Sequence, residues 1–309
     1  MITTVSLNPC IDRTVRLKRF VYGGMNRAAA ARSDAGGKAI NVAITAARLD
    51  VAAGCIGLLY KENGRIIENK LLGSGTQCDF VWLEGRVRTN IKLFDESTSQ
   101  VTEINEAGQP VSEATLEKML DMIADHAASS DFLVLTGSLP PGCPDDFYRT
   151  VIESVEGLDC RCVLDAEGVK FNEAVKANPF LIKPNLYELE VSMGRSFTEL
   201  KDIRDAALRY VDGGVQNVAV SLGSRGALLT NGKETYYAPR MDVPVQSTVG
   251  AGDAMVAGLT AGFLAEKELA EVLRMGAAAG TASCMTEGTQ LLEKAMYKNL
   301  LEKIEIQRM

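Results

Sequence analysis

Short apolar segments typical of buried strands alternate with segments of helical periodicity along most of this sequence. The expected strands are Thr3–Leu7, Ala53–Leu59, Phe132–Thr136, Arg161–Asp165, Phe180–Lys183 and Asn217–Ser221. The expected helices are Ile40–Leu49, Gly64–Leu72, Glu113–Ala128, Gly252–Leu264, Leu269–Met285, Leu291–Ile304, and one toward Gly213 that opens with a capping box at Ser196 and Glu199. Parallel strands need crossover connections, which are usually helices, so this alternation predicts an α/β fold with a largely parallel central sheet.

Three segments interrupt the alternation because their apolar residues recur with a period of two and polar residues lie between them. They are Thr14–Leu17, Arg88–Phe94 and Gln100–Ile104. This pattern is typical of antiparallel strands outside a main sheet. We therefore expect one domain over residues 1–309 with a small β-layer, which would act as a lid or a dimer surface, within about residues 12–34 and 86–105.

Composition excludes several classes of function. The 309 residues carry a net charge of −7 without a Lys/Arg-rich block, so we expect no nucleic-acid partner. The single histidine, His126, rules out a multi-histidine zinc site. No apolar run reaches the about 18 residues of a membrane span, and the amino-terminal segment lacks the pattern of a signal peptide. We expect no membrane partner.

The seven cysteines are scattered and form no paired framework. Cys160 and Cys162 are the closest pair, but their spacing is not the C-x-x-C of redox and zinc sites. We expect buried free thiols, which are typical of a reducing cytoplasm.

A glycine-rich turn leads directly into the apolar helix expected at Gly252–Leu264, with Asp253 in its first turn. Free backbone N–H groups at a helix start bind anions such as phosphate. Asp253 then has two interpretations: it favours the positive end of the helix, or it acts as a general base beside an anion hole. The turn is neither a Walker A loop nor a G-x-G-x-x-G motif.

A further helix start carries polar groups. Lys38 and Asn41 follow Gly36 and Gly37 on one face of an expected helix, where a lysine is disfavoured unless it meets an anion. The alternative is a tight turn with a solvated lysine.

Asn185 and Glu188 lie three residues apart after the strand that ends at Lys183. An amide and a carboxylate that face one way suit a water-rich Mg²⁺ site, although this signal is weak alone.

Other polar residues follow the expected strands. Asp12 comes just after the first strand, Ser138 lies in the turn after Thr136, and a glycine loop follows Ser221, which is where ligands of open parallel sheets bind. The basic residues Arg27, Arg88 and Lys92 lie in or beside the expected β-layer. Their grouping predicts a phosphate clamp, although each alone reads as a surface charge.

Together these motifs resemble the PfkB branch of the ribokinase-like sugar kinases over essentially the whole chain. In order they are NPCID, NRA, AGGKAINVA, RTNIK, TEIN, TGSLPPG, IKPNLYE, SLGSRGA and TVGAGDAM. NPCID, the lysine of AGGKAINVA, and RTNIK followed by TEIN look most like 1-phosphofructokinases, with tagatose-6-phosphate kinases as close relatives. The resemblance implies a three-layer α/β sandwich with a small β-lid, often a dimer surface, and phosphorylation of a sugar phosphate by ATP with Mg²⁺.

The resemblance also implies roles for individual residues. Asp253 would be the catalytic base, and the anion hole would be Gly250, Ala251 and Gly252. The acceptor would meet Asp12, Gly37 and Asn41 through its hydroxyls, and Lys38, Arg27 and Arg88 through its phosphate, with Asn90 and Lys92 nearby. Gly36 and Ser138 are the other residues expected to bind the substrate. The nucleotide side would be Lys183, Asn185, Ser221, Gly223, Gly226 and Thr248, and Glu188 would be linked to Mg²⁺.

The sequence departs from the family pattern at Ala39, which replaces a glycine, at Ala254, which replaces a serine, and in the stretch Asp165–Gly168. None of these changes removes an expected catalytic group. We expect phosphorylation of fructose 1-phosphate to fructose 1,6-bisphosphate, with tagatose-6-phosphate kinase or 6-phosphofructokinase activity as the alternatives. A non-catalytic sugar-phosphate sensor is the alternative from another class, but it would not need Asp253 and its glycine loop.

Overall fold

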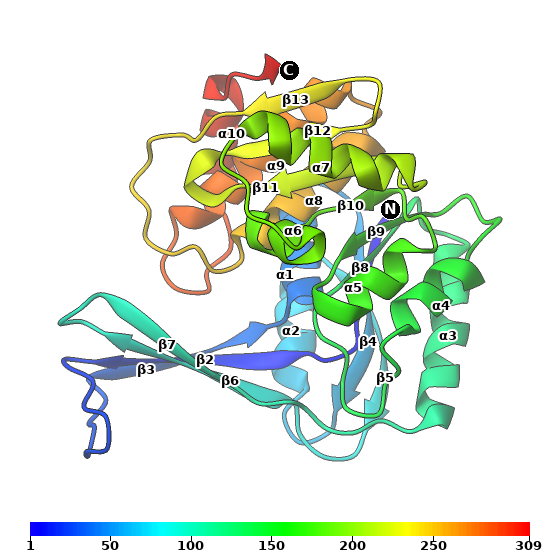
Figure 1. Ribbon diagram of the computed structural model, residues 1–309. Coiled ribbons are helices and arrows are strands. Elements are labelled where there is room, and N and C mark those ends of the chain that lie inside the picture. The colour runs from blue at the N-terminus through cyan, green and yellow to red at the C-terminus, as the bar shows by residue number, and fades with distance from the viewer.

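The computed structural model describes residues 1–309 and contains one large central sheet (Figure 1). Its ten strands lie in the order β14 (Gln307–Arg308), β13 (Thr235–Ala238), β12 (Ala227–Thr230), β11 (Asn217–Ser221), β10 (Leu181–Ile182), β9 (Arg161–Asp165), β8 (Phe132–Thr136), β1 (Ile2–Ser6), β4 (Ala53–Tyr60) and β5 (Gln77–Leu83). Neighbouring strands from β11 to β5 are parallel, and β12, β13 and β14 extend the other edge in antiparallel pairs.

Helices cover both faces of this sheet because its strands are apolar on both sides. In β8, Leu133 and Leu135 belong to one apolar cluster and Phe132 and Val134 to another. The first cluster packs against α3 (Glu113–Ala127), α4 (Phe147–Ser154), α5 (Gly168–Val175), α6 (Leu186–Met193) and α7 (Leu200–Asp212). The opposite face is covered by α1 (Lys38–Arg48), α2 (Arg65–Gly73), α8 (Ala251–Leu264), α9 (Leu269–Cys284) and α10 (Lys294–Lys303). The expected three-layer α/β architecture is confirmed.

A second, four-stranded sheet projects from the main body as an arm (Figure 1). Its order is β3 (Ala30–Gly36), β2 (Cys10–Leu17), β6 (Arg88–Asp95) and β7 (Gln100–Asn105). The expectation of antiparallel strands is wrong for the central pair, because β2 and β6 run parallel. Antiparallel neighbours can be joined by a short hairpin, whereas β2 and β6 are separated by β3, α1, β4, α2 and β5. Their register places Asp12 opposite Asn90.

Several element boundaries differ from expectation. The capping box at Ser196 and Glu199 is wrong, because Glu199 is itself the N-cap of α7 and makes no side-chain cap hydrogen bond. The last long helix begins at Lys294 rather than Leu291. The short helices α4, α5 and α6 and the edge strands β12 to β14 carry too few residues for a periodic signal, so the sequence did not predict them.

The α8 and α9 helices pack closely because glycines face the contact. A Cβ atom at Gly258 would lie 2.5 Å from the carbonyl oxygen of Met275, and one at Gly262 would lie 3.0 Å from the Cα of Val272. The apolar character of α8 therefore serves helix packing. No helix of the protein has both the length and the apolar character needed to span a membrane.

Gly258→Ala should destabilise the fold, because the added methyl must push against the α9 backbone. We expect a loss of about 1–3 kcal/mol in the free energy of unfolding, measured by urea denaturation. Gly73→Ala is the matched control, because a Cβ there meets nothing within 4 Å and alanine favours a helix. Equal stability of the two variants would contradict the close packing of α8 on α9.

Candidate active site

The carboxylate of Asp165, the last residue of β9, is the meeting point of two lysines. Its Oδ2 lies 3.4 Å from the Nζ of Lys38, and its Oδ1 lies 3.1 Å from the Nζ of Lys183. The hydroxyl of Thr136, at the end of the neighbouring strand β8, donates a hydrogen bond to Oδ2 at 3.1 Å. The sequence predicted no site role for Asp165, because the stretch Asp165–Gly168 departs from the family pattern, and the available signal was its place at the end of a parallel strand.

The negative charge of Asp165 and the positive charges of Lys38 and Lys183 lie together at a largely buried position. Burial alone would raise the pKa of Asp165, but the charges of Lys183 and Lys38 outweigh burial and hold that pKa at about 2. The carboxylate in turn raises the pKa of Lys38 above its usual range, although burial acts in the opposite direction. Asp165 is therefore ionised and Lys38 is protonated at neutral pH.

The amino terminus of α8 lies beside this cluster. Gly250 is the N-cap residue and has a φ of 79°, a left-handed conformation that suits glycine, and Ala251, Gly252 and Asp253 follow. A Cβ atom at Gly252 would lie 3.5 Å from the Nζ of Lys183, so this ammonium lies against the first turn of α8. Helix N–H groups and a lysine charge together form a site for an anion.

Asp253 is 6% exposed, and its side chain is held by a residue of α1. The side-chain amide of Asn41, in the first turn of α1, donates a hydrogen bond to its Oδ2 at 2.8 Å. Burial raises the pKa of Asp253, the charge of Lys38 opposes this rise, and nearby Asp165 adds to it. A carboxylate with a raised pKa is a better proton acceptor, as a general base requires. The pairing of Asn41 with Asp253 had no signal in the sequence.

Asn185 and Glu188 form a capping box, whereas the sequence predicted one at Ser196 and Glu199. The Oδ1 of Asn185 accepts from the N–H of Glu188 at 2.8 Å, and the Oε2 of Glu188 accepts from the N–H of Asn185 at 2.7 Å. Both side chains therefore cap the start of α6, and only Oε2 of the Glu188 carboxylate accepts a hydrogen bond within the protein. Burial raises the pKa of Glu188.

The remaining residues predicted for the nucleotide lie at neighbouring strand ends. Ser221 forms an isolated parallel bridge with Asn185, at the ends of β11 and β10. Gly223 and Gly226 bound the tight turn after β11, and a Cβ at Gly226 would clash with the carbonyl of Ala238 at 2.0 Å. Thr248 is exposed, and its carbonyl accepts from the N–H of Ala251 at 3.3 Å.

Among the residues predicted for the acceptor, Asp12 is buried in the small sheet. Its Oδ2 lies 3.4 Å from the Nζ of Lys92, and its Oδ1 accepts from the amide of Asn90 at 3.3 Å. A Cβ at Gly36 would lie 2.5 Å from Oδ2, so only glycine fits beside this carboxylate. Gly37 follows as the N-cap of α1, with a φ of 116°.

Arg88 joins the small sheet to the main body. Its guanidinium donates to the carbonyls of Asn8 at 3.3 Å and Glu106 at 2.8 Å and to the hydroxyl of Ser138 at 3.2 Å. Arg27, by contrast, is exposed in the connection between β2 and β3, which lies at the far end of the arm (Figure 1). Within one chain, the structure brings Arg88 and Ser138 together and leaves Arg27 apart.

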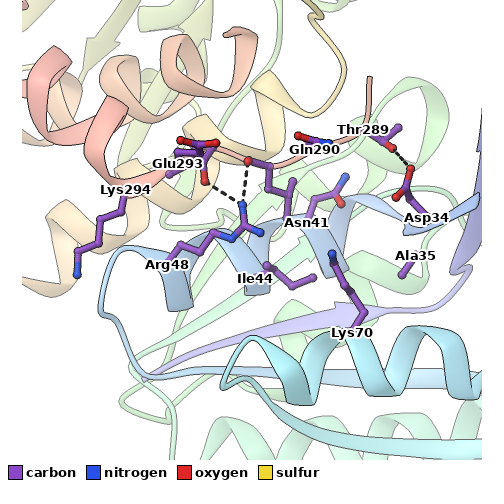
Figure 2. Close-up of a pocket in the computed structure, with 12 residues that line it drawn as sticks. Asp34, Ala35, Asn41, Ile44, Arg48, Lys70, Thr289, Gln290, Glu293 and Lys294 are labelled. Carbon is purple, nitrogen blue, oxygen red and sulfur yellow. Dashed lines mark hydrogen bonds between the residues drawn. The ribbon is translucent and has the colours of Figure 1, made fainter. Parts of the chain in front are cut away.

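A cavity of about 490 Å³ borders the cluster along α1, beside α2 and residues 289–294 (Figure 2). Asn41 lines it, so this amide both borders the cavity and contacts Asp253. The guanidinium of Arg48 donates to the carbonyls of Leu291 and Leu292 at 2.8 and 2.9 Å. These bonds fix residues 289–294 against the helix that carries Lys38 and Asn41.

Asp165→Asn should destabilise the protein, because Lys183 is 4% exposed and would lose its anionic partner. We expect a loss of about 3–5 kcal/mol in the free energy of unfolding at neutral pH, measured by urea denaturation. Asp131→Asn is the control, because Asp131 is exposed and pairs with the amino terminus of the chain just before β8, at the end of the strands opposite to Asp165.

The pH dependence gives a second readout of the same variant. Folding lowers the pKa of Asp165 from 3.8 to about 2, so its contribution is complete above about pH 4 and is lost as the pH falls toward about 2. The stability difference between the wild type and Asp165→Asn should shrink over this range. A difference that stays constant would contradict the ion-pair assignment.

Comparisons with known proteins agree with this geometry. The sequence profile of the pfkB family of carbohydrate kinases matches residues 5–295. A 1-phosphofructokinase of Rhodobacter capsulatus is 37% identical over 278 residues, which cover 90% of this chain and 88% of the relative. A 1-phosphofructokinase of Bacillus subtilis is 32% identical over 309 residues and 100% of both chains. Phosphofructokinase-2 from Escherichia coli, solved in complex with substrates and products, superimposes with a TM-score of 0.92 at 28% identity, covering 98% of this chain and 99% of that one. The chain belongs to the PfkB family of carbohydrate kinases and has their ribokinase-like fold.

Proposed function

We propose that this protein transfers the γ-phosphoryl group of ATP to the C6 hydroxyl of fructose 1-phosphate and so forms fructose 1,6-bisphosphate. Full-length relatives named 1-phosphofructokinase support this substrate. The observation that carries the proposal is the buried Asp253 at the start of α8, next to the ammonium of Lys183. A base beside an anion site is what phosphoryl transfer to an alcohol requires.

In the proposed reaction, Asp253 accepts the proton of the C6 hydroxyl, and the oxygen attacks the γ-phosphorus in line with the leaving ADP oxygen. The bond from phosphorus to the new oxygen forms as the bond to ADP breaks. The N–H groups of Gly250, Ala251 and Gly252 stabilise the charge on the transferred group. Asn41 orients Asp253 through the hydrogen bond at 2.8 Å.

The acceptor lies between the small sheet and the start of α1. Asp12, Gly36, Gly37 and Asn41 meet its hydroxyls, and Lys38 and Arg88 bind its phosphate beside Ser138 and Asn90. This proposal rests on the distances that bring these groups to one edge of the sheet. Closure of the small sheet as a lid would exclude water and limit wasteful hydrolysis of ATP.

ATP lies on the other side of the cluster in this proposal. Lys183 binds its phosphates, and Asn185, Ser221, Gly223, Gly226 and Thr248 line its path along the strand ends. Glycine at 223 and 226 lets the backbone turn sharply there, with φ values of 57° and 93°.

The carboxylate groups of the site suit a Mg²⁺ ion that is held mainly by ligands other than the protein. No group of three or more His, Cys, Asp or Glu side chains converges as a metal-ligand set. Glu188 offers one carboxylate oxygen without a hydrogen-bond partner, which suits an ion held mainly by water and nucleotide phosphates. We propose that Glu188 holds Mg²⁺ through such a shell, and the ion then supplies charge neutralisation on the phosphates.

The second candidate acceptor is fructose 6-phosphate. A phosphofructokinase-2 from Escherichia coli was solved in complex with fructose-6-phosphate, and it superimposes with a TM-score of 0.89 at 27% identity. Tagatose 6-phosphate is the other ketohexose phosphate that the motifs leave open. A non-catalytic sensor is disfavoured because Asp253, its glycine turn and Asn41 are all in place.

We also propose that two copies associate through the small sheet. Val101 and Ile104 on β7 and Tyr22 in the β2–β3 connection are 51%, 54% and 94% exposed. A second copy that contacts β7 and the β2–β3 connection would bury exposed apolar side chains and would place an additional phosphate ligand, Arg27, near a neighbouring site. Sedimentation equilibrium should give twice the chain mass, and Tyr22→Asp should shift the protein toward the monomer. A monomeric wild type would contradict this proposal.

We place the protein in the cytoplasm, a proposal that its cysteines support. All seven are free thiols, and Cys10, Cys55, Cys160 and Cys162 are buried. Burial raises the pKa of the Cys55 thiol to about 12, so it is unreactive at neutral pH. Activity in the soluble fraction of lysed cells tests this location.

Asp253→Asn tests the catalytic assignment. The variant keeps the shape of the side chain and loses the proton acceptor, so kcat should fall by about 10²- to 10⁴-fold. The affinity for ATP, measured by calorimetry, should change little. Asp242→Asn, an exposed position before the glycine turn, is the control and should keep full activity. Turnover of Asp253→Asn close to that of the wild type would refute the base assignment.

A further inference from the structure

We propose that Lys92 is a positioning residue for Asp12 and does not bind the phosphate of the acceptor. This inference deepens the proposed function and rests on it. It also revises the phosphate clamp that the grouping of Arg27, Arg88 and Lys92 predicted.

Burial and geometry carry the proposal. Asp12 and Lys92 are 5% and 8% exposed, and the Oδ2–Nζ distance is 3.4 Å. The two residues belong to β2 and β6, whose parallel pairing places Asp12 opposite Asn90. Asn90 and Lys92 are two residues apart on β6, so both side chains point to the same face of the sheet. Asp12 therefore receives both donors from one strand.

The carboxylate of Asp12 is fixed on all sides. Oδ1 accepts from the amide of Asn90 at 3.3 Å and from the thiol of Cys10 at 3.6 Å. Oδ2 faces Lys92 on one side and Gly36 on the other, where a Cβ would approach it to 2.5 Å. An ionised carboxylate offers about four lone-pair sites, so Asp12 keeps acceptor capacity for sugar hydroxyls while its orientation is held.

A phosphate at Lys92 would be unfavourable for two reasons. A phosphate in contact with Nζ would also lie close to the Asp12 carboxylate, which is 3.4 Å from that atom, and like charges repel. The ammonium also has little open surface to offer a second anion. Arg88 has neither obstacle, because its guanidinium contacts carbonyls, a hydroxyl and an amide oxygen. Lys38 also lies 3.4 Å from a carboxylate, that of Asp165, but 38% of its side chain is exposed and open to a second anion.

Lys92→Met separates the two roles because it keeps the apolar stem and removes the charge. If Lys92 positions Asp12, kcat/KM for fructose 1-phosphate should fall about tenfold or more through KM, with kcat and the KM for ATP nearly unchanged. The inhibition constant of inorganic phosphate, measured in competition with the acceptor at saturating ATP, should not change. Lys92→Arg should recover part of the acceptor affinity, and Lys18→Met, an exposed lysine of the same arm, should match the wild type.

A double-mutant cycle with Asp12→Asn then tests whether Lys92 acts through Asp12. In the Asp12→Asn background, Lys92→Met should cost little further acceptor affinity, because its target is already lost. Thermal unfolding of the four proteins shows whether each is folded. The double variant should be more stable than either single variant, because each single variant leaves one buried charge without its partner.

If the wild-type enzyme is active, two results would overturn the inference. One is a weaker inhibition by inorganic phosphate in Lys92→Met, which would make Lys92 a phosphate ligand. The other is an additive loss in the double variant. A wild type that phosphorylates no ketohexose phosphate would instead contradict the proposed function, and the inference with it.

Discussion

The buried carboxylate of Asp165 is the interaction on which the candidate site depends. It ends β9 and pairs with Lys38 at the start of α1 and with Lys183 just after β10, so three segments of the chain meet at one charge. One lysine faces the proposed acceptor and the other lies against the start of α8. Burying an unpaired ammonium or carboxylate costs free energy, so Asp165 and the two lysines stabilise one another in their charged forms. The two halves of the site are thus fixed relative to each other before any ligand binds.

A second buried pair, Asp12 with Lys92, plays the corresponding part in the small sheet. The main body carries Asp253 and the candidate anion site, and the arm carries the groups proposed for the acceptor, so the proposed reaction uses both sheets. Arg88 connects them through carbonyls on either side of the junction. The net charge of −7 is compatible with the two anionic substrates that we propose, because the cations of the candidate site are concentrated locally.

Much of the fold could be predicted from the sequence, because the spacing of apolar residues in a long segment indicates whether it is a helix or a strand and which of its faces is buried. The bounds of β8, β9 and β11 are as expected, and the glycine turn before α8 correctly placed Asp253 at a helix start. Asp165 and the hydrogen bond from Asn41 to Asp253 were missed because they join residues far apart in the chain. The capping box was misplaced because Asn185 and Ser196 both precede a Glu by three residues, and only packing decides which one opens a helix.

The most direct test of the central claim is an ATP-coupled assay of the purified protein with four acceptors: fructose 1-phosphate, fructose 6-phosphate, tagatose 6-phosphate and fructose. The account predicts the highest kcat/KM for fructose 1-phosphate, with fructose 1,6-bisphosphate as the product identified by phosphorus NMR. Free fructose should be a poor substrate, because the phosphate ligands Lys38 and Arg88 would have nothing to bind. Equal or better turnover of free fructose, or no phosphorylation of any of the four, would contradict it.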